Sequence, residues 1–259
     1  MRRNIIKKQM IKMDYQPIKQ AIANSMLPIE SAPFVDDRPR RFDTSLFIET
    51  ALAMIVAVIA IKIFGLNSAL RASWLTTPGI LIVVALIPTV VKKHEFPRFG
   101  FNIRQMKDSL VVLGWTCVVF LPLTFCGLWL LVSLGFELPL LPVMPRGQAW
   151  IYWLFYQFLY ISLAEEVFFR GYVQNNILRL TNPVMGKLPR LQQWISIVIS
   201  AACFAAAHII VQGQIISALI FLPGLVLGWL FIRTRSLLAP ILFHGLANVC
   251  YLFMTAILT

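Results

Sequence analysis

Two adjacent carboxylates stand in a strongly apolar part of the sequence, within the stretch 162–171, SLAEEVFFRG. Arg170 follows Glu166 by four residues, so a helix places this acid and this base on one face. Glu165 lies about 100° away around the same helix. Two neighbouring carboxylates in a low dielectric resist simultaneous ionisation, and their proton affinities are therefore coupled. We predict a division of roles, in which one carboxylate is structural and the other is reactive.

Two of the three histidines also lie in apolar stretches, farther along the chain. Phe204 precedes His208 by four residues, which predicts an aromatic pocket wall one helical turn before the imidazole. His244 precedes Asn248 by the same spacing, so one helix face presents an imidazole beside a carboxamide. A single histidine in a membrane helix usually makes a hydrogen bond between helices. Because the strong polar groups gather in three helices, we favour a polar interior site.

The elements that position these residues are expected to be membrane helices, because 59% of the 259 residues are hydrophobic. Apolar stretches near the bilayer-spanning length of about 20 residues occur at 47–66, 75–91, 109–135, 149–169, 193–211, 215–232 and 238–258. We predict an all-α, polytopic membrane bundle of about seven transmembrane helices. The second stretch is short and the third is long, which leaves open a re-entrant segment or a strong tilt.

The formal net charge of +12 is distributed as membrane topology requires and does not indicate nucleic-acid binding. Nine of the 23 lysines and arginines lie in residues 1–41, five in 92–107 and three in 179–190. The loops between these regions carry one basic residue each or none. Since cytoplasmic loops are enriched in Lys and Arg, we predict a cytoplasmic N-terminus and place Thr259 outside.

The domain organisation that we predict has two parts. Residues 1–46 are a basic cytoplasmic arm, because lysines and arginines interrupt its short apolar runs and leave no cleavable signal. Residues 47–259 form one transmembrane domain, since no internal repeat and no glycine-rich phosphate loop occurs. The four cysteines stand in apolar stretches without C-x-x-C spacing, so neither disulfides nor a thiolate metal site is predicted.

Three motifs in order along successive helices resemble the CAAX-protease and bacteriocin-processing family of intramembrane endopeptidases, also called CPBP or Abi. The motifs are EEVFFRG, FAAAH and HGLAN, which follow the patterns E-E-x-x-x-R, F-x-x-x-H and H-x-x-x-N. The resemblance covers a catalytic half at about residues 150–255 and says little about residues 1–140.

The resemblance implies that Glu165 and His208 activate a water for attack on a peptide carbonyl. It further implies that His244 and Asn248 stabilise the oxyanion. These side chains suit such roles, because a desolvated glutamate can serve as a base and an imidazole and an amide can donate to developing negative charge. The substrate would be a membrane-associated protein or peptide.

The resemblance also implies supporting roles for Glu166 and Arg170, which would orient the first carboxylate. The cofactor remains open. Glu165, His208 and His244 could form a two-histidine, one-carboxylate zinc site with an open position for water. The sequence lacks the H-E-x-x-H pattern and a further obvious ligand, so we favour a scheme without a metal and keep zinc as the alternative.

The depth of the candidate residues tests whether they converge. At 1.5 Å per residue, Glu165 and His208 lie about 21 Å from the cytoplasmic ends of their helices, whereas His244 lies about 9 Å from its own. Convergence therefore requires that the fourth and fifth helices protrude into the cytoplasm, or that the seventh begins outside the bilayer.

Two other functions compete with the endopeptidase. A membrane transporter or proton-coupled channel would also use membrane carboxylates and histidines, although repeated halves and paired broken helices are not evident. A non-catalytic immunity or partner-binding membrane protein would retain the motifs without hydrolysis. In each case we expect an integral, multi-pass protein whose surroundings are the lipid bilayer, and we assign it to the bacterial cytoplasmic membrane.

Overall fold

The structure, a computed structural model, describes residues 42–66, 76–91, 106–136, 147–185 and 189–258. These residues belong to the unit Phe34–Thr259 and contain helices and no strand. The first helices are α3 (Thr44–Leu66), α5 (Thr76–Val91) and α6 (Met106–Ser133). The last are α10 (Pro189–Gln212), the 3₁₀ segment η5 (Ile215–Ile220), α11 (Phe221–Thr234) and α12 (Leu238–Leu258). The all-α, polytopic prediction is confirmed.

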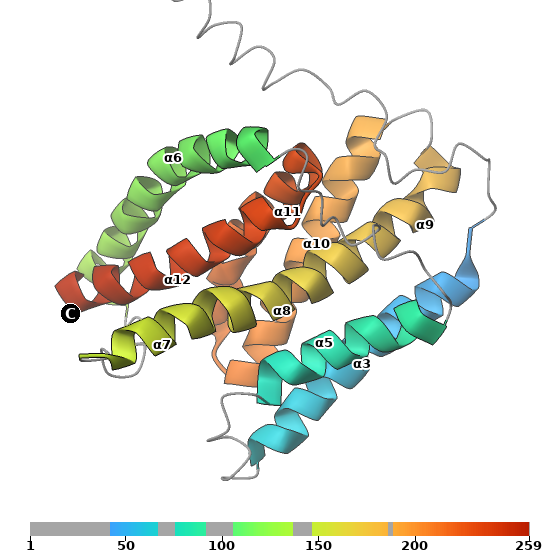
Figure 1. Cartoon of the computed structure of the whole chain (residues 1–259), viewed down its shortest axis with the longest axis horizontal. Helices are drawn as coiled ribbons and strands as arrows, with labels where there is room; N and C mark the ends of the chain where they lie inside the picture. Colours follow the sequence, from blue (N-terminus) through green and yellow to red (C-terminus); the bar gives the residue numbers. More distant parts are fainter. Residues whose placement is uncertain (1–41, 67–75, 92–105, 137–146, 186–188, 259) are drawn as a thin grey trace, which may run out of the picture. The chain divides into compact units, whose positions relative to one another are not determined.

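A single uninterrupted helical run, the central helix, occupies residues 149–185 (Figure 1). It consists of α7 (Ala149–Phe155), the π segment η3 (Tyr156–Ser162), α8 (Leu163–Glu166), the π segment η4 (Val167–Gln174) and α9 (Asn175–Met185). At 1.5 Å per residue such a helix is about 55 Å long, and the hydrocarbon core is about 30 Å thick. The central helix therefore has the length that protrusion from the bilayer requires.

The seven predicted apolar stretches all fall on these helical segments. Within the described ranges, five helices are long and apolar enough to cross a membrane, namely α3, α6, α10, η5 with α11, and α12. The helix α5 has 16 residues, and the stretch 149–169 forms part of the central helix. The orientation of the chain stays a prediction. The predicted basic arm, residues 1–46, lies outside the described residues except for positions 42–46. The helix α3 begins at Thr44, within these last positions.

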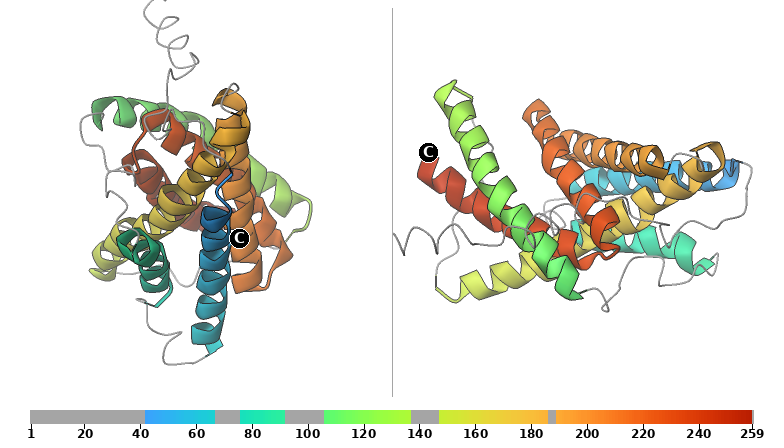
Figure 2. Two further views of the ribbon diagram at one scale, coloured as in Figure 1. Left: turned by 90° about the vertical axis from the view of Figure 1, so that its right-hand side faces the viewer. Right: turned by 90° about the horizontal axis from the view of Figure 1, so that it is seen from above.

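The central helix is surrounded by most of the other helices. Its first half contacts α12, its second half contacts α10, and α3 and α5 lie along a further side (Figure 1). The helix α6 packs across α11 and α12 (Figure 2). Large apolar side chains of α6 such as Trp115, Leu123 and Trp129 are exposed. Such a surface is expected where a helix faces lipid rather than water.

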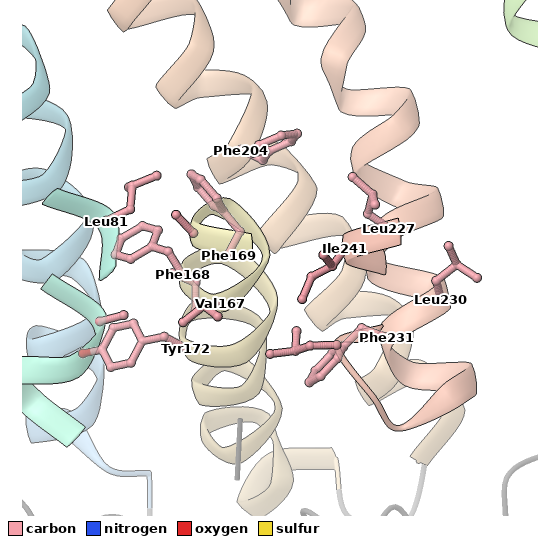
Figure 3. Packing of buried hydrophobic residues seen from close by; sticks show 14 of the residues in the cluster. Leu81, Val167, Phe168, Phe169, Tyr172, Phe204, Leu227, Leu230, Phe231 and Ile241 are labelled. Atoms are coloured by element: carbon pink, nitrogen blue, oxygen red, sulfur yellow. The ribbon is translucent and has the colours of Figure 1, made fainter. Parts of the chain in front are cut away.

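The apolar core is built around η4, whose eight residues are all buried. Phe168 and Tyr172 lie on the side of α5 and Leu81, whereas Phe169 lies on the side of Phe204 from α10 (Figure 3). The rings of Phe169 and Phe204 meet edge to face with centroids 4.9 Å apart. A helix that is buried all round lies inside the bundle. Residues 167–174 are therefore shielded from lipid by neighbouring helices.

Polar contacts attach α3 to the central helix below this core. The hydroxyl of Tyr172 donates to Glu49 Oε1 at 3.0 Å, and the amide of Asn176 donates to Thr50 Oγ1 at 3.1 Å. We did not single out Glu49, because it lies close to the start of its predicted span. The contacts show that the first described helix is held to the helix that carries both adjacent glutamates.

The helix α12 approaches the central helix closely at Gly245. A Cβ atom at this position would lie 2.4 Å from the Phe158 ring, which is closer than real Cβ contacts allow. We expect Gly245→Ala to lower the free energy of unfolding by about 1–3 kcal/mol, because overpacking forces the helices apart. Thermal unfolding of the purified protein in detergent measures this loss.

A matched control is Gly114→Ala in α6, where a Cβ would meet nothing within 4 Å. This variant should be at least as stable as the wild type, because alanine is the better helix former. The double variant Gly245→Ala with Phe158→Ala should be more stable than expected from the two separate losses, because the smaller side chain removes the clash. Strictly additive losses would contradict the close contact.

Candidate active site

Glu166 and Arg170 form a fully buried ion pair inside the central helix. Arg170 Nη1 lies 3.1 Å from Glu166 Oε1, and both side chains are 0% exposed. Arg170 Nη2 also donates to the carbonyl of Gly224 on α11 at 3.2 Å. The guanidinium carbon lies 4.6 Å from the centroid of the Phe204 ring, a favourable cation–π distance. The buried charge of Arg170 is thus compensated from three directions.

His244 connects this ion pair to the other carboxylate. Its Nδ1 lies 2.8 Å from Glu166 Oε1, and its Nε2 lies 3.7 Å from Glu165 Oε2. Glu166 Oε1 also accepts from Arg170, and with the carboxylate oxygen as acceptor the proton of this contact lies on His244 Nδ1. The resemblance implies that Glu166 orients Glu165. In the structure its contacts run to Arg170 and to His244, so Glu166 acts on the site through the imidazole.

His208 reaches the same carboxylate from α10. Its Nδ1 lies 2.9 Å from the carbonyl oxygen of Phe204, and because a carbonyl only accepts, Nδ1 is the donor. Nε2 lies 4.0 Å from Glu165 Oε2. The Phe204 ring meets the His208 ring edge to face at 4.5 Å and the His244 ring at 5.9 Å. Phe204 therefore forms a wall shared by both imidazoles.

Glu165 is the point on which both histidines converge. Its Oε2 is buried and has no hydrogen-bond partner among the described protein atoms. The two Nε2 atoms lie beyond direct hydrogen-bond range of Oε2, at separations where a water can join two polar groups. The side chains of Glu165 and His208 are 14% and 21% exposed. The group is therefore sheltered while keeping an opening to its surroundings.

Asn248 lies one turn beyond His244 and is held by a residue that we did not single out. Its Nδ2 donates to Gln157 Oε1 at 3.0 Å. Gln157 belongs to η3 and is 9% exposed. The signal available in the sequence is a strongly polar side chain inside the apolar stretch 149–169, eight residues before Glu165. Asn248 thus contacts Gln157, whereas the side chains that approach Glu165 are His208 and His244.

The two adjacent glutamates close a single α-helical turn between two π segments. The turn is α8, Leu163–Glu166, with η3 before it and η4 after it. Insertions of π geometry shift the rotational register of a helix and are frequent at functional sites. Here they lie on either side of the carboxylates, so the faces of the central helix before and after them do not follow the ideal helical wheel.

The donor atoms of the cluster also bear on the zinc alternative. Among the residues that the structure describes, no group of three or more His, Cys, Asp and Glu side chains is arranged so that it could hold a metal ion. The choice between the metal-free scheme and a zinc ion held by Glu165, His208 and His244 stays a prediction.

Comparison with known proteins supports the function that the motifs indicate. Residues 147–250 match the family model described as type II CAAX prenyl endopeptidase Rce1-like. The matched segment contains both glutamates, Arg170, both histidines and Asn248. Comparisons with curated proteins and with solved structures find no match.

Proposed function

Because residues 147–250 match the model of a CAAX endopeptidase family, we propose that Glu165 and His208 activate a water that hydrolyses a peptide bond. The family is one of endopeptidases, and the apolar helices make this an integral, multi-pass membrane protein. The substrate in this proposal is a membrane-associated protein or peptide.

The observation that carries the proposal is the convergence of two imidazoles on one carboxylate oxygen. His244 Nε2 and His208 Nε2 lie 3.7 Å and 4.0 Å from Glu165 Oε2. A water bound to Oε2 can also donate a hydrogen bond to the unprotonated Nε2 of His208. Two acceptors hold the water in one orientation, so that its oxygen lone pair is directed at the substrate. A carboxylate that is buried beside a reactant is a suitable general base.

The reaction then proceeds by direct water attack. Glu165 takes one proton from the water as the water oxygen bonds to the peptide carbonyl carbon. The carbonyl oxygen becomes an oxyanion, to which a protonated His244 Nε2–H and the Asn248 amide donate. The C–N bond breaks as Glu165 passes its proton to the departing nitrogen. Water has then been added across the peptide bond, and Glu165 is again ionised.

In this proposal the ion pair of Glu166 and Arg170 orients the His244 imidazole and does not contact the substrate. Glu166 accepts from His244 Nδ1, so the proton on Nδ1 is held away from the reaction and Nε2 faces the substrate side. Arg170 Nη1 lies 3.1 Å from Glu166 Oε1, so the carboxylate has a basic partner inside the protein. A measurement of the metal content of active protein separates this scheme from the zinc alternative.

The proposal is tested by identifying a cleavage product in membranes. We expect cells that produce the wild-type protein to contain a new peptide terminus that is missing from cells producing Glu165→Ala, because this variant lacks the proposed base. Mass spectrometry of membrane-associated peptides detects such termini, and prenylated C-terminal segments are the first to inspect because the matched family is named for them.

A control variant excludes that loss of the product reflects a change of a carboxylate in general or a lower protein level. Glu49→Gln changes a carboxylate of α3 that contacts Tyr172, outside the proposed catalytic group. This variant should produce the same terminus as the wild type. Full production of the terminus by Glu165→Ala at equal protein levels would refute the catalytic assignment.

A further inference from the structure

Gln157 is a buried polar residue of the central helix that the proposed reaction leaves without a role. It lies in η3, and its side-chain oxygen accepts a hydrogen bond from the Asn248 amide at 3.0 Å. Transfer of an amide from water into an apolar environment is costly unless a partner compensates for it. This hydrogen bond joins the two amides at the contact of η3 with α12.

We propose that Gln157 is a positioning residue that aims the Asn248 amide at the oxyanion, an inference that rests on the proposed function. A carboxamide can rotate by half a turn and present either its oxygen or its nitrogen to a substrate. In the structure Gln157 Oε1 accepts from Asn248 Nδ2, so the amide nitrogen of Asn248 lies on the side of Gln157. Asn248 has two N–H groups, so one remains to donate to the oxyanion while the other is held by Gln157.

In this proposal the same contact also decides which atom of the Asn248 amide faces the developing negative charge. An oxyanion facing an amide oxygen would be repelled, whereas an oxyanion facing N–H is stabilised. Free rotation of Asn248 would make the productive orientation only one of several. An acceptor at Gln157 reduces that loss before the substrate binds, and such preorganisation contributes to catalysis.

The helix geometry around Gln157 supports a specific alignment. An α-helix would place residues eight apart, such as Gln157 and Glu165, about 80° from each other. The π segment η3 rotates less per residue and brings them nearer to one face. Both side chains accordingly meet α12, Gln157 at Asn248 and Glu165 at His244.

The close approach at Gly245 limits how far α12 can move from the central helix near Gln157. Gly245 lies between His244 and Asn248 in the sequence, and the Phe158 ring occupies the space that a Cβ would need. Phe158 directly follows Gln157. The glutamine is thus anchored beside a contact that leaves the two helices little freedom to separate.

Kinetics of the purified full-length protein in liposomes test the positioning role, with the peptide found in the membrane comparison as substrate. We expect Gln157→Leu to lower kcat about 10-fold with little change in KM, which is less than the 10²–10³-fold typical of losing an oxyanion donor outright. Gln157→Glu retains an acceptor oxygen and should be more active than Gln157→Leu. Added to Asn248→Ala, Gln157→Leu should change kcat by less than about twofold, because the group that it positions is gone.

A matched control separates positioning from general loss of stability. Gln192 is a buried glutamine whose Nε2 donates to the carbonyl of Leu178, away from the proposed site. Gln192→Leu should lower the melting temperature and leave kcat unchanged. If Gln157→Leu fails to fold, Gln157→Glu with and without Asn248→Ala still measures the coupling of the two residues.

The possible outcomes distinguish this proposal from the one on which it rests. Equal hydrolysis by wild type and Glu165→Ala overturns the proposed function, and the positioning role with it. A clear difference between these two, combined with an unchanged kcat in Gln157→Leu, overturns the positioning role alone. The positioning role is also overturned if Gln157→Leu lowers kcat by the same factor in the wild type and in Asn248→Ala.

Discussion

Replacing Glu165 by glutamine is expected to lower kcat by about 10³-fold or more, because the carboxylate is the proposed base for the attacking water. Glutamine has nearly the same shape and cannot accept the proton. The neighbouring ion pair should remain intact, since Glu166 Oε1 contacts Arg170 and His244 rather than Glu165. Single-turnover hydrolysis of the membrane peptide measures the chemical step directly.

His208 supplies a sharper form of the same test. Its Nε2 faces the Glu165 oxygen at 4.0 Å, and both groups are proposed to bind one water. Residues that act as a unit have strongly non-additive effects. We therefore expect Glu165→Gln combined with His208→Gln to be little slower than Glu165→Gln alone. Two losses that multiply would show that these residues act independently.

Replacing Arg170 by leucine is expected to lower the stability of the protein by about 3–5 kcal/mol, the cost of breaking a buried ion pair from one side. Glu166 would be left buried without its guanidinium partner, because both side chains are fully enclosed. The carbonyl of Gly224 would also lose its donor. Thermal unfolding in detergent should show a large fall in melting temperature.

The reason for this loss can be isolated by changing the other partner. The double variant Arg170→Leu with Glu166→Gln removes the uncompensated charge and should be more stable than Arg170→Leu alone. Lys62→Leu is a suitable control, because this basic residue of α3 is exposed. It should have little effect on the melting temperature. An Arg170→Leu variant as stable as Lys62→Leu would contradict a structural role for the ion pair.

Much of the bundle follows from the length and periodicity of the apolar stretches. Seven of them fall on helical segments, because a chain in lipid must satisfy its backbone hydrogen bonds within each segment. The division of 149–185 into α and π segments was not predicted. A π insertion changes the register by a fraction of a turn and leaves little trace in a pattern of residue types.

Contacts within one helix were also accessible from spacing alone. Glu166 pairs with Arg170, and Phe204 stands beside His208, as four-residue separations require. The contact of His244 with Glu166 joins positions 78 residues apart, and that of Asn248 with Gln157 joins positions 91 residues apart. No helical periodicity relates residues on different helices, so these pairs required the packed structure.

The sequence alone determined that this chain forms apolar helices and which of their faces carry carboxylates, imidazoles and an amide, because helical spacing and transfer free energy act locally. Only the tertiary structure decided which of these groups meet. The two imidazoles converge on Glu165, Glu166 turns to His244, and Gln157 holds Asn248. Such pairings depend on how closely helices approach, and here a glycine against the Phe158 ring sets that distance.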